Sequence, residues 1–182
     1  MTSRVLLISH AATSATRHTA FPGDEPLAIT GTTDPVPRHR LAVSGPEQRC
    51  LQTAGMLGLQ PTVEPRLRDC DYGRWVGRTL DELSTVEPDA VREWLNDPAS
   101  APHGGESIVD MMTRVSAWLD EQTEPGRVVA VTHPSVIKAT VTHAVRGTPE
   151  SYWRIDIAPL VRVGLTGRPG AWTLYSLGRD GQ

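Results

Sequence analysis

The feature that most constrains this chain is an apolar run that ends at a histidine, and it occurs twice. Val5–Ile8 is followed one residue later by His10, and Val128–Val131 is followed in the same way by His133. Such runs are typical of buried parallel strands, and ligands bind at the carboxyl ends of these strands. One histidine after a strand is usually a loop or cap residue, but two at equivalent points favour a site. If the two strands are neighbours, His10 and His133 lie side by side.

The remaining sequence alternates between candidate strands and candidate helices. We expect strands over residues 3–9, 41–44, 61–64 and 127–132, and two more within 154–178 that are separated by residues 167–170. We expect helices over residues 46–57, 88–96, 107–121 and 134–145, and a short one over 27–32. This alternation predicts an α/β fold with three layers, in which helices cover both faces of a mostly parallel central sheet. The length suits a single domain over residues 1–182.

Local signals indicate where these helices begin and which faces they bury. Pro46 is expected at the first position of its helix. Thr79 and Glu82 have the spacing of a capping box, and Ser107 is the expected cap of the helix that follows it. Apolar residues at helical spacing predict the buried faces; they are Cys50, Leu51, Ala54 and Leu57 in one helix, and Ile108, Met111, Met112, Val115, Trp118 and Leu119 in another.

Composition excludes some classes of protein. The 18 basic and 21 acidic residues give a net charge of −3, which argues against a nucleic-acid-binding or membrane-surface protein. Cys50 and Cys70 have no ligand-like spacing, so a reduced, cytoplasmic protein is expected. Val5–Ile8 is too short for a signal-peptide core or a membrane span. We expect no cofactor.

Four residues carry chemistry that suits a phosphoryl group. A neutral imidazole such as that of His10 or His133 can attack phosphorus, and its ordinary pKa of about 6.5 leaves it largely neutral at pH 7. Arg49 offers the bidentate donors that phosphoryl oxygens accept, and Asp69 can act as an acid or a base. Two histidines and one aspartate could also bind zinc, but no paired-ligand spacing supports this, and we expect no metal.

With these residues in view, the chain resembles the histidine phosphatase superfamily, also called the phosphoglycerate mutase-like family. Ser9–Thr13 stands where that family has Arg-His-Gly followed by Glu-Thr, and Ser44–Ala54 matches Ser-Ser-Pro-x-x-Arg-Ala-x-Gln-Thr-Ala. Leu67–Gly77 matches Leu-x-Glu-x-x-Phe-Gly-x-Trp-x-Gly. Shorter matches are Phe21–Leu27, Gly105–Ser107 and Val131–His133. Each motif alone is weak, but the ordered set covers nearly the whole chain.

The resemblance implies a role for each matched residue. His10 would be the nucleophile that becomes phosphohistidine, and His133 and Arg49 would bind the phosphoryl group. Asp69 stands where the mutase-and-phosphatase branch has its acid/base glutamate. The other branch has its acid directly after the second histidine, where this chain has Pro134. Glu106 and Ser107 would offer amides at a helix N-terminus to the anion.

The departures from the family pattern also carry information. Ser9 stands where the family has an arginine that clamps the phosphoryl group, and loss of one preorganised donor typically lowers the rate by about 10²–10³-fold. Arg17 is the best replacement in the sequence, followed by His18. Thr16 replaces a usual asparagine, and Asp69 is one methylene shorter than glutamate.

Three hypotheses follow. The first is a phosphomonoesterase that hydrolyses a small metabolite phosphate through phosphohistidine; the short chain favours a phosphatase over a mutase, because little remains to form a closing cap. The second is a catalytically impaired module that binds phosphate or another ligand, which Ser9 favours. The third is an enzyme of this fold that acts on a non-phosphate substrate. A homodimer is possible. Trp153 and Trp172 could serve an interface, but their sequence context favours core or edge-strand packing.

Overall fold

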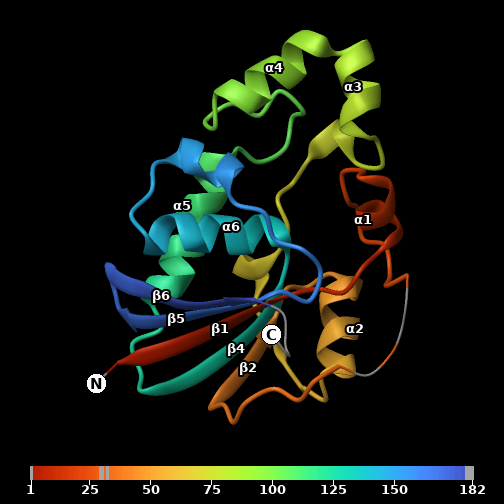
Figure 1. Ribbon diagram of the computed structural model, residues 1–182. Helices are drawn as coiled ribbons and strands as arrows, with labels where there is room; N and C mark the ends of the chain where they lie inside the picture. Colours follow the sequence, from red (N-terminus) through yellow and green to blue (C-terminus); the bar gives the residue numbers. More distant parts are fainter. Residues whose placement is uncertain (1, 29–30, 32, 179–182) are drawn as a thin grey trace.

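The computed structural model describes residues 2–28, 31 and 33–178, and its centre is a twisted β-sheet (Figure 1). The strands in these residues are β1 (Ser3–Ser9), β2 (Leu41–Ser44), β3 (Thr62–Val63), β4 (Gly126–Thr132), β5 (Arg162–Arg168) and β6 (Ala171–Gly178). Their order in the sheet is β3-β2-β4-β1-β5-β6. The first four are mutually parallel, whereas β5 runs antiparallel to β1 and β6 antiparallel to β5. The prediction of a mostly parallel sheet is confirmed.

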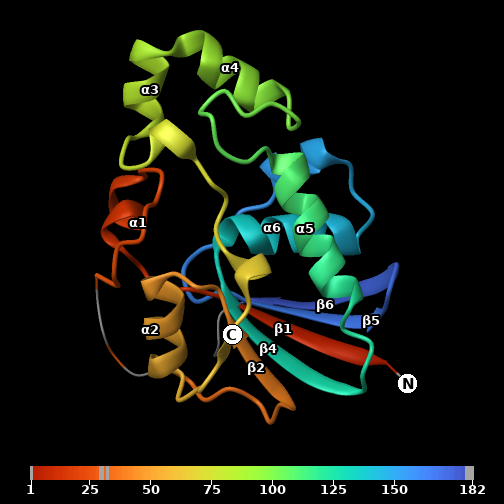
Figure 2. The ribbon, with the colours of Figure 1, turned by 180° about the vertical axis from the view of Figure 1, so that it is seen from behind.

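Helices cover both faces of this sheet (Figures 1 and 2). The helices are α1 (Ser14–His18), α2 (Gln48–Met56), α3 (Leu80–Val86), α4 (Pro88–Asn96), α5 (Ile108–Asp120) and α6 (Pro134–Ala144). Short 3₁₀ helices lie at Pro65–Leu67, Gly73–Trp75 and Pro149–Arg154. In both views α3 and α4 lie at the end of the molecule farthest from the sheet. The three-layer α/β architecture is therefore as expected.

The period of two along each strand divides the core into two clusters. On one face Leu6 and Val129 pack with Cys50 and Ala54 of α2. The alternate residues, such as Leu7, pack against α5 and α6 on the other face. Because β1 and β4 are hydrogen-bonded neighbours in parallel register, with Ser9 opposite Thr132, their carboxyl ends lie at the same edge of the sheet.

Several predicted boundaries shift in the structure. The helix expected from Pro46 begins at Gln48, because Glu47 is still extended and its side chain turns toward His133. Leu51 is 39% exposed: the buried face of α2 is instead formed by Arg49, Cys50, Thr53 and Ala54. The strand expected within 154–178 begins only at Arg162, since the preceding residues form a 3₁₀ turn and an extended connection.

Helix α1 and the 3₁₀ elements were not predicted from the sequence. Helix α1 has only five residues and no buried side chain, so it has no apolar periodicity. Reciprocal hydrogen bonds between Thr13 and Thr16 cap its N-terminus. The 3₁₀ turn Pro149–Arg154 is too short for a helical pattern. The short helix expected over 27–32 lies partly outside the described residues, and Leu27 itself forms an isolated bridge to Thr13. None of the described helices is long and apolar enough to cross a membrane.

Candidate active site

The candidate site lies where β1 and β4 end. His10 follows β1 and donates its backbone N–H to the carbonyl of Thr132 over 2.9 Å. His133 follows β4 and precedes α6. The two imidazole ring centroids are 5.3 Å apart, and both side chains are buried. The prediction that His10 and His133 lie side by side is confirmed.

One ring nitrogen of His10 is held by the backbone, which leaves the other as a nucleophile. Nδ1 lies 2.7 Å from the carbonyl oxygen of Ala11. A carbonyl only accepts, so Nδ1 carries the proton and Nε2 has the free lone pair. Burial and, next, the neighbouring His133 lower the pKa of His10 to about 4. The imidazole of His10 is therefore neutral at physiological pH.

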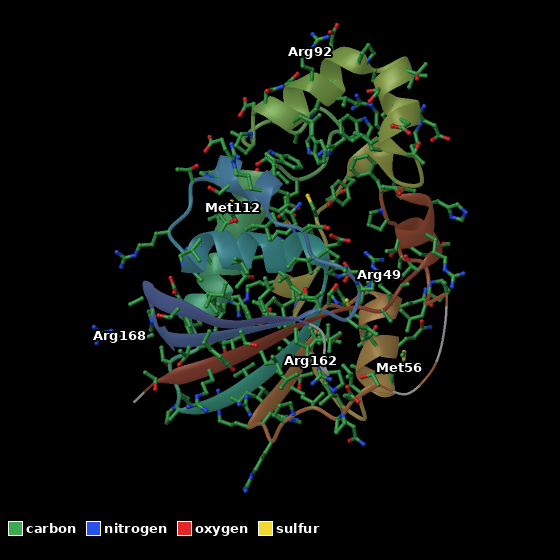
Figure 3. All side chains as sticks on the ribbon, in the orientation of Figure 1. Arg49, Met56, Arg92, Met112, Arg162 and Arg168 are labelled. Atoms are coloured by element: carbon green, nitrogen blue, oxygen red, sulfur yellow. The ribbon has the colours of Figure 1, made fainter. Side chains whose placement is uncertain are left out.

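Arg49 connects the parts of the site from the first turn of α2 (Figure 3). Its Nε donates to Nδ1 of His133 over 3.3 Å, and one terminal nitrogen donates to Oδ2 of Asp69 over 2.7 Å. The other terminal nitrogen donates to the carbonyl of Gly23. Arg49 has no exposed surface. It thus holds the histidine, the aspartate and the loop after α1 in one arrangement.

Asp69 is engaged through both of its oxygens. Oδ2 pairs with Arg49 and lies 3.3 Å from Nδ1 of His133, whereas Oδ1 accepts from the Ser135 hydroxyl and from the backbone N–H of Cys70. Burial alone would raise the pKa of Asp69, but the charges of His133 and Arg49 outweigh it, and the pKa is lowered. Asp69 is a carboxylate in this state.

Glu47 is a site residue that sequence reasoning missed. Its Oε2 lies 2.7 Å from Nε2 of His133, and Oε1 accepts the backbone N–H of Asp69 over 2.9 Å. Burial would raise the pKa of Glu47, yet the hydrogen bond and charge of His133 lower it overall. The available signal was the position of Glu47 two residues before Arg49, where the helix start brings it to the end of β4. His133 is therefore flanked by a carboxylate at each ring nitrogen.

The other predicted binding residues are less directly placed. Ser9 is fully buried at the end of β1, and its hydroxyl has no hydrogen-bond partner among the described residues. Arg17 is exposed on α1, and within the described part of the chain its side chain forms no ion pair. The hydroxyl of Thr16 hydrogen-bonds to Thr13 at the start of α1.

Glu106 and Ser107 have structural partners. The carboxylate of Glu106 pairs with Arg68 and Arg114, and its backbone N–H donates to the carbonyl of Asp71. Ser107 caps α5, as predicted. The expectation that the Glu106 amide meets the anion is not supported, because that N–H is already used.

The structure also brings together a set of possible metal ligands. One ligand atom each from Glu47, Cys50 and His133 lies within 4.8 Å of the others. The set differs from the two histidines and one aspartate that the sequence raised. It combines a carboxylate, a thiol and an imidazole, which are the ligand types of zinc sites.

Gly45 gives the site its close packing. A Cβ at this position would lie 2.7 Å from the carbonyl oxygen of Leu67 and 3.1 Å from Nε2 of His133. Because the first neighbour is backbone, we expect Gly45→Ala to destabilise the protein by about 1–3 kcal/mol. Gly55→Ala in α2 is the control: it meets nothing within 4 Å and should stabilise by about 0.5–1 kcal/mol. Urea unfolding measures both, and equal stability of Gly45→Ala and the parent would contradict this packing.

Comparison with known proteins identifies relatives of the chain. Residues 32–180 match the model of the histidine phosphatase superfamily, branch 1. The chain is 37% identical over 129 residues to a glucosyl-3-phosphoglycerate phosphatase of Mycolicibacterium vanbaalenii, across 63% of this chain and 57% of that protein. It therefore spans little more than half the length of that relative.

Solved structures share the fold over almost the whole chain. A mycobacterial glucosyl-3-phosphoglycerate phosphatase in complex with VO3 is 26% identical with a TM-score of 0.82, and the match covers 97% of this chain and 99% of that one. A phosphoserine phosphatase of Entamoeba histolytica gives a TM-score of 0.83 at 19% identity, with 98% of each chain covered; this likeness concerns the fold alone. The family match, which begins after the His10 segment, covers most of the sequence, and the chain belongs to branch 1 of the histidine phosphatase superfamily.

Proposed function

We propose that this protein is a phosphomonoesterase that hydrolyses a small metabolite phosphate through a phosphohistidine at His10. The observation that carries the proposal is the buried, neutral His10, whose Nδ1 is held by Ala11 and whose Nε2 has no hydrogen-bond partner among the described residues. His133, Arg49 and Asp69 join it in one cluster. This combination provides a nucleophile, phosphoryl-binding donors and an acid/base group.

The proposed reaction has two steps. Nε2 of His10 attacks phosphorus, the bond from phosphorus to the ester oxygen breaks, and the leaving oxygen takes a proton from Asp69. Water then attacks the phosphohistidine, gives its proton to Asp69, and inorganic phosphate leaves as His10 is regenerated. Asp69 is a carboxylate without substrate, but a bound phosphate dianion raises the pKa of a nearby carboxyl group by like-charge repulsion. Substrate binding therefore favours the protonated form of Asp69, which can then act as the general acid.

We assign the remaining phosphoryl contacts to residues near the end of β1. The resemblance puts Ser9 at an arginine position, so a positive charge must come from elsewhere. Arg17 is exposed and unpaired within the described chain, which leaves its guanidinium available. The buried hydroxyl of Ser9 has no partner among the described residues and is assigned to a phosphoryl oxygen.

Arg17 has a specific expected effect. Arg17→Ala should raise KM for a phosphate ester by about 10-fold or more, because a guanidinium bound to phosphate carries a charge-assisted, bidentate interaction. Steady-state kinetics at fixed ionic strength measure it, with Arg92→Ala on the far helix α4 as the matched loss of an exposed arginine. Equal kinetics of the two variants would show that Arg17 is only a solvated residue on the surface of α1.

The names of sequence relatives support a substrate class. They describe phosphatases of glucosyl-3-phosphoglycerate and phosphoserine, which are small phosphate esters that also carry a carboxylate. We propose such esters as the first panel. The test is release of inorganic phosphate across this panel, with vanadate as inhibitor; no release from any ester, and no vanadate binding, would contradict the proposal.

Ser9 favours a catalytically impaired binding module instead, because the resemblance puts a phosphoryl-clamping arginine at that position. Tight phosphate binding without turnover would support that second function. No phosphate binding would support the third hypothesis, a non-phosphate substrate.

The possible homodimer and the cytoplasmic location stay predictions. The free thiols of Cys50 and Cys70 suit a reducing compartment.

A further inference from the structure

We propose that Glu47, Cys50 and His133 form a binding site for a thiophilic divalent cation of the Zn²⁺ type. Nε2 of His133 lies 2.7 Å from Oε2 of Glu47 and 3.3 Å from Sγ of Cys50. All three ligand atoms lie within 4.8 Å of one another. Three protein ligands leave a fourth position for water, which is the pattern of an open zinc site.

The distances between the three ligand atoms suit a zinc ion after small movements of the side chains. Bond lengths of about 2.0–2.3 Å to nitrogen, oxygen and sulfur imply ligand-to-ligand distances of about 3.2–3.7 Å in a tetrahedron. The Nε2-to-Sγ distance of 3.3 Å is close to this range, and the Nε2-to-Oε2 distance of 2.7 Å needs to widen. Glu47 lies just before α2 begins, and its side chain is 17% exposed, so it is the ligand that can move.

A second carboxylate is in place to orient the histidine. When Nε2 binds a metal, the proton of the neutral ring must be on Nδ1. In the structure Nδ1 accepts from Nε of Arg49, so metal binding moves the ring proton from Nε2 to Nδ1 and requires the Arg49 Nε–H to turn aside. Oδ2 of Asp69, 3.3 Å from Nδ1, is then placed to accept that proton in a hydrogen bond. Asp69 is itself held by Arg49 and Ser135. This is the carboxylate–histidine–metal arrangement found in zinc proteins.

The local charge also favours a cation. Among the described residues of this cluster, the three carboxylates of Glu25, Glu47 and Asp69 pair with only two basic side chains, Arg49 and His133. Metal binding converts the Cys50 thiol to a thiolate and releases one proton, so Zn²⁺ with one thiolate, one carboxylate and one neutral imidazole is electrically neutral. A buried thiolate and imidazole select Zn²⁺ over Mg²⁺ or Ca²⁺, which prefer oxygen ligands. The partly exposed Glu47 marks the entry side.

Occupation of this site has a consequence that rests on the proposed function. A metal on Nε2 removes His133 from the phosphoryl group, so Zn²⁺ should inhibit hydrolysis, and Cys50→Ala should relieve that inhibition. The metal site itself is tested without turnover, which separates failure of this inference from failure of the phosphatase proposal.

The experiment titrates the full-length reduced protein with Co²⁺ as a spectroscopic probe and then displaces it with Zn²⁺. A bound thiolate gives a near-ultraviolet charge-transfer band. We expect this band, with one Co²⁺ per chain, in the parent and in Cys70→Ala, whose buried thiol donates to the carbonyl of Glu106. We expect no band in Cys50→Ala, in which alanine matches the family motif and keeps α2 packed.

Affinity provides a second measurement. Calorimetric titration should show Zn²⁺ binding weakened by at least about 100-fold in Cys50→Ala, since loss of even an outer-shell partner costs about 10–100-fold. Glu47→Gln should also weaken binding. A parent protein without the thiolate band, or equal Zn²⁺ affinity in the parent and Cys50→Ala, would overturn the inference.

Discussion

Replacement of His10 by alanine should lower kcat by about 10⁴-fold or more on any phosphate ester that the protein hydrolyses. The reason is that His10 is the group proposed to form the covalent bond, and loss of a nucleophile removes most of the benefit of its partners. His39→Ala is the matched control, because His39 is exposed and, within the described residues, its ring hydrogen-bonds only to the carbonyl of Pro37. Phosphate-release assays with both variants give the comparison. Activity of His10→Ala within 10-fold of the parent would exclude His10 as the nucleophile.

The pH dependence of His10 follows from its surroundings. Burial, and then the nearby His133, lower its pKa from 6.5 to about 4. The reactive form is neutral, so His10 is competent above about pH 4 and loses its lone pair to a proton only below it. An NMR titration of the His10 ring should therefore show its midpoint near pH 4. A midpoint near 6.5 would mean that the ring is solvated, contrary to the structure.

Replacement of Arg49 by alanine should have the largest effect on stability. Arg49 is buried and donates to Asp69, His133 and Gly23. Its removal leaves the carboxylate of Asp69 buried without its cation and opens a cavity in α2. Breaking a buried pair in this way typically costs about 3–5 kcal/mol, and we expect hydrolysis to be lost as well.

The control for this variant is Arg92→Ala. Arg92 pairs with Asp89 on the outer surface of α4 (Figure 3), and its side chain is 70% exposed, so its loss should cost no more than about 1 kcal/mol. Denaturant unfolding of both variants measures the difference. Arg49→Lys should not restore activity, because a point charge cannot replace a planar fork of donors. Similar stability losses in the alanine variants would show that Arg49 is not an organising residue.

The sequence predicted the parts of the fold that have a strong period or a strong cap. The apolar runs before His10 and His133 became β1 and β4, and the caps at Thr79 and Ser107 start their helices as expected. Short elements were missed because five or six residues do not establish a period. Helix α1 depends instead on the hydrogen bonds of Thr13.

The site shows a similar division. Residues at strand ends and in the motif around Arg49 converge as predicted, because parallel strands end at one edge of the sheet. Glu47 was missed, since its role depends on the extended backbone just before α2 and on the direction of its side chain toward His133. Glu106 was expected near the anion, but Arg68 and Arg114 hold its carboxylate. Which residues form ion pairs depends on contacts between segments that are distant in the sequence, and local sequence patterns do not reveal those contacts.

The most direct test of the central proposal is rapid-quench trapping with a ³²P-labelled ester, in parent protein and in His10→Ala. We predict a phosphoprotein that is acid-labile and base-stable, forms before phosphate is released, and is absent from His10→Ala. Release of phosphate with no trapped species, or label that persists in His10→Ala, would contradict a phosphohistidine at His10.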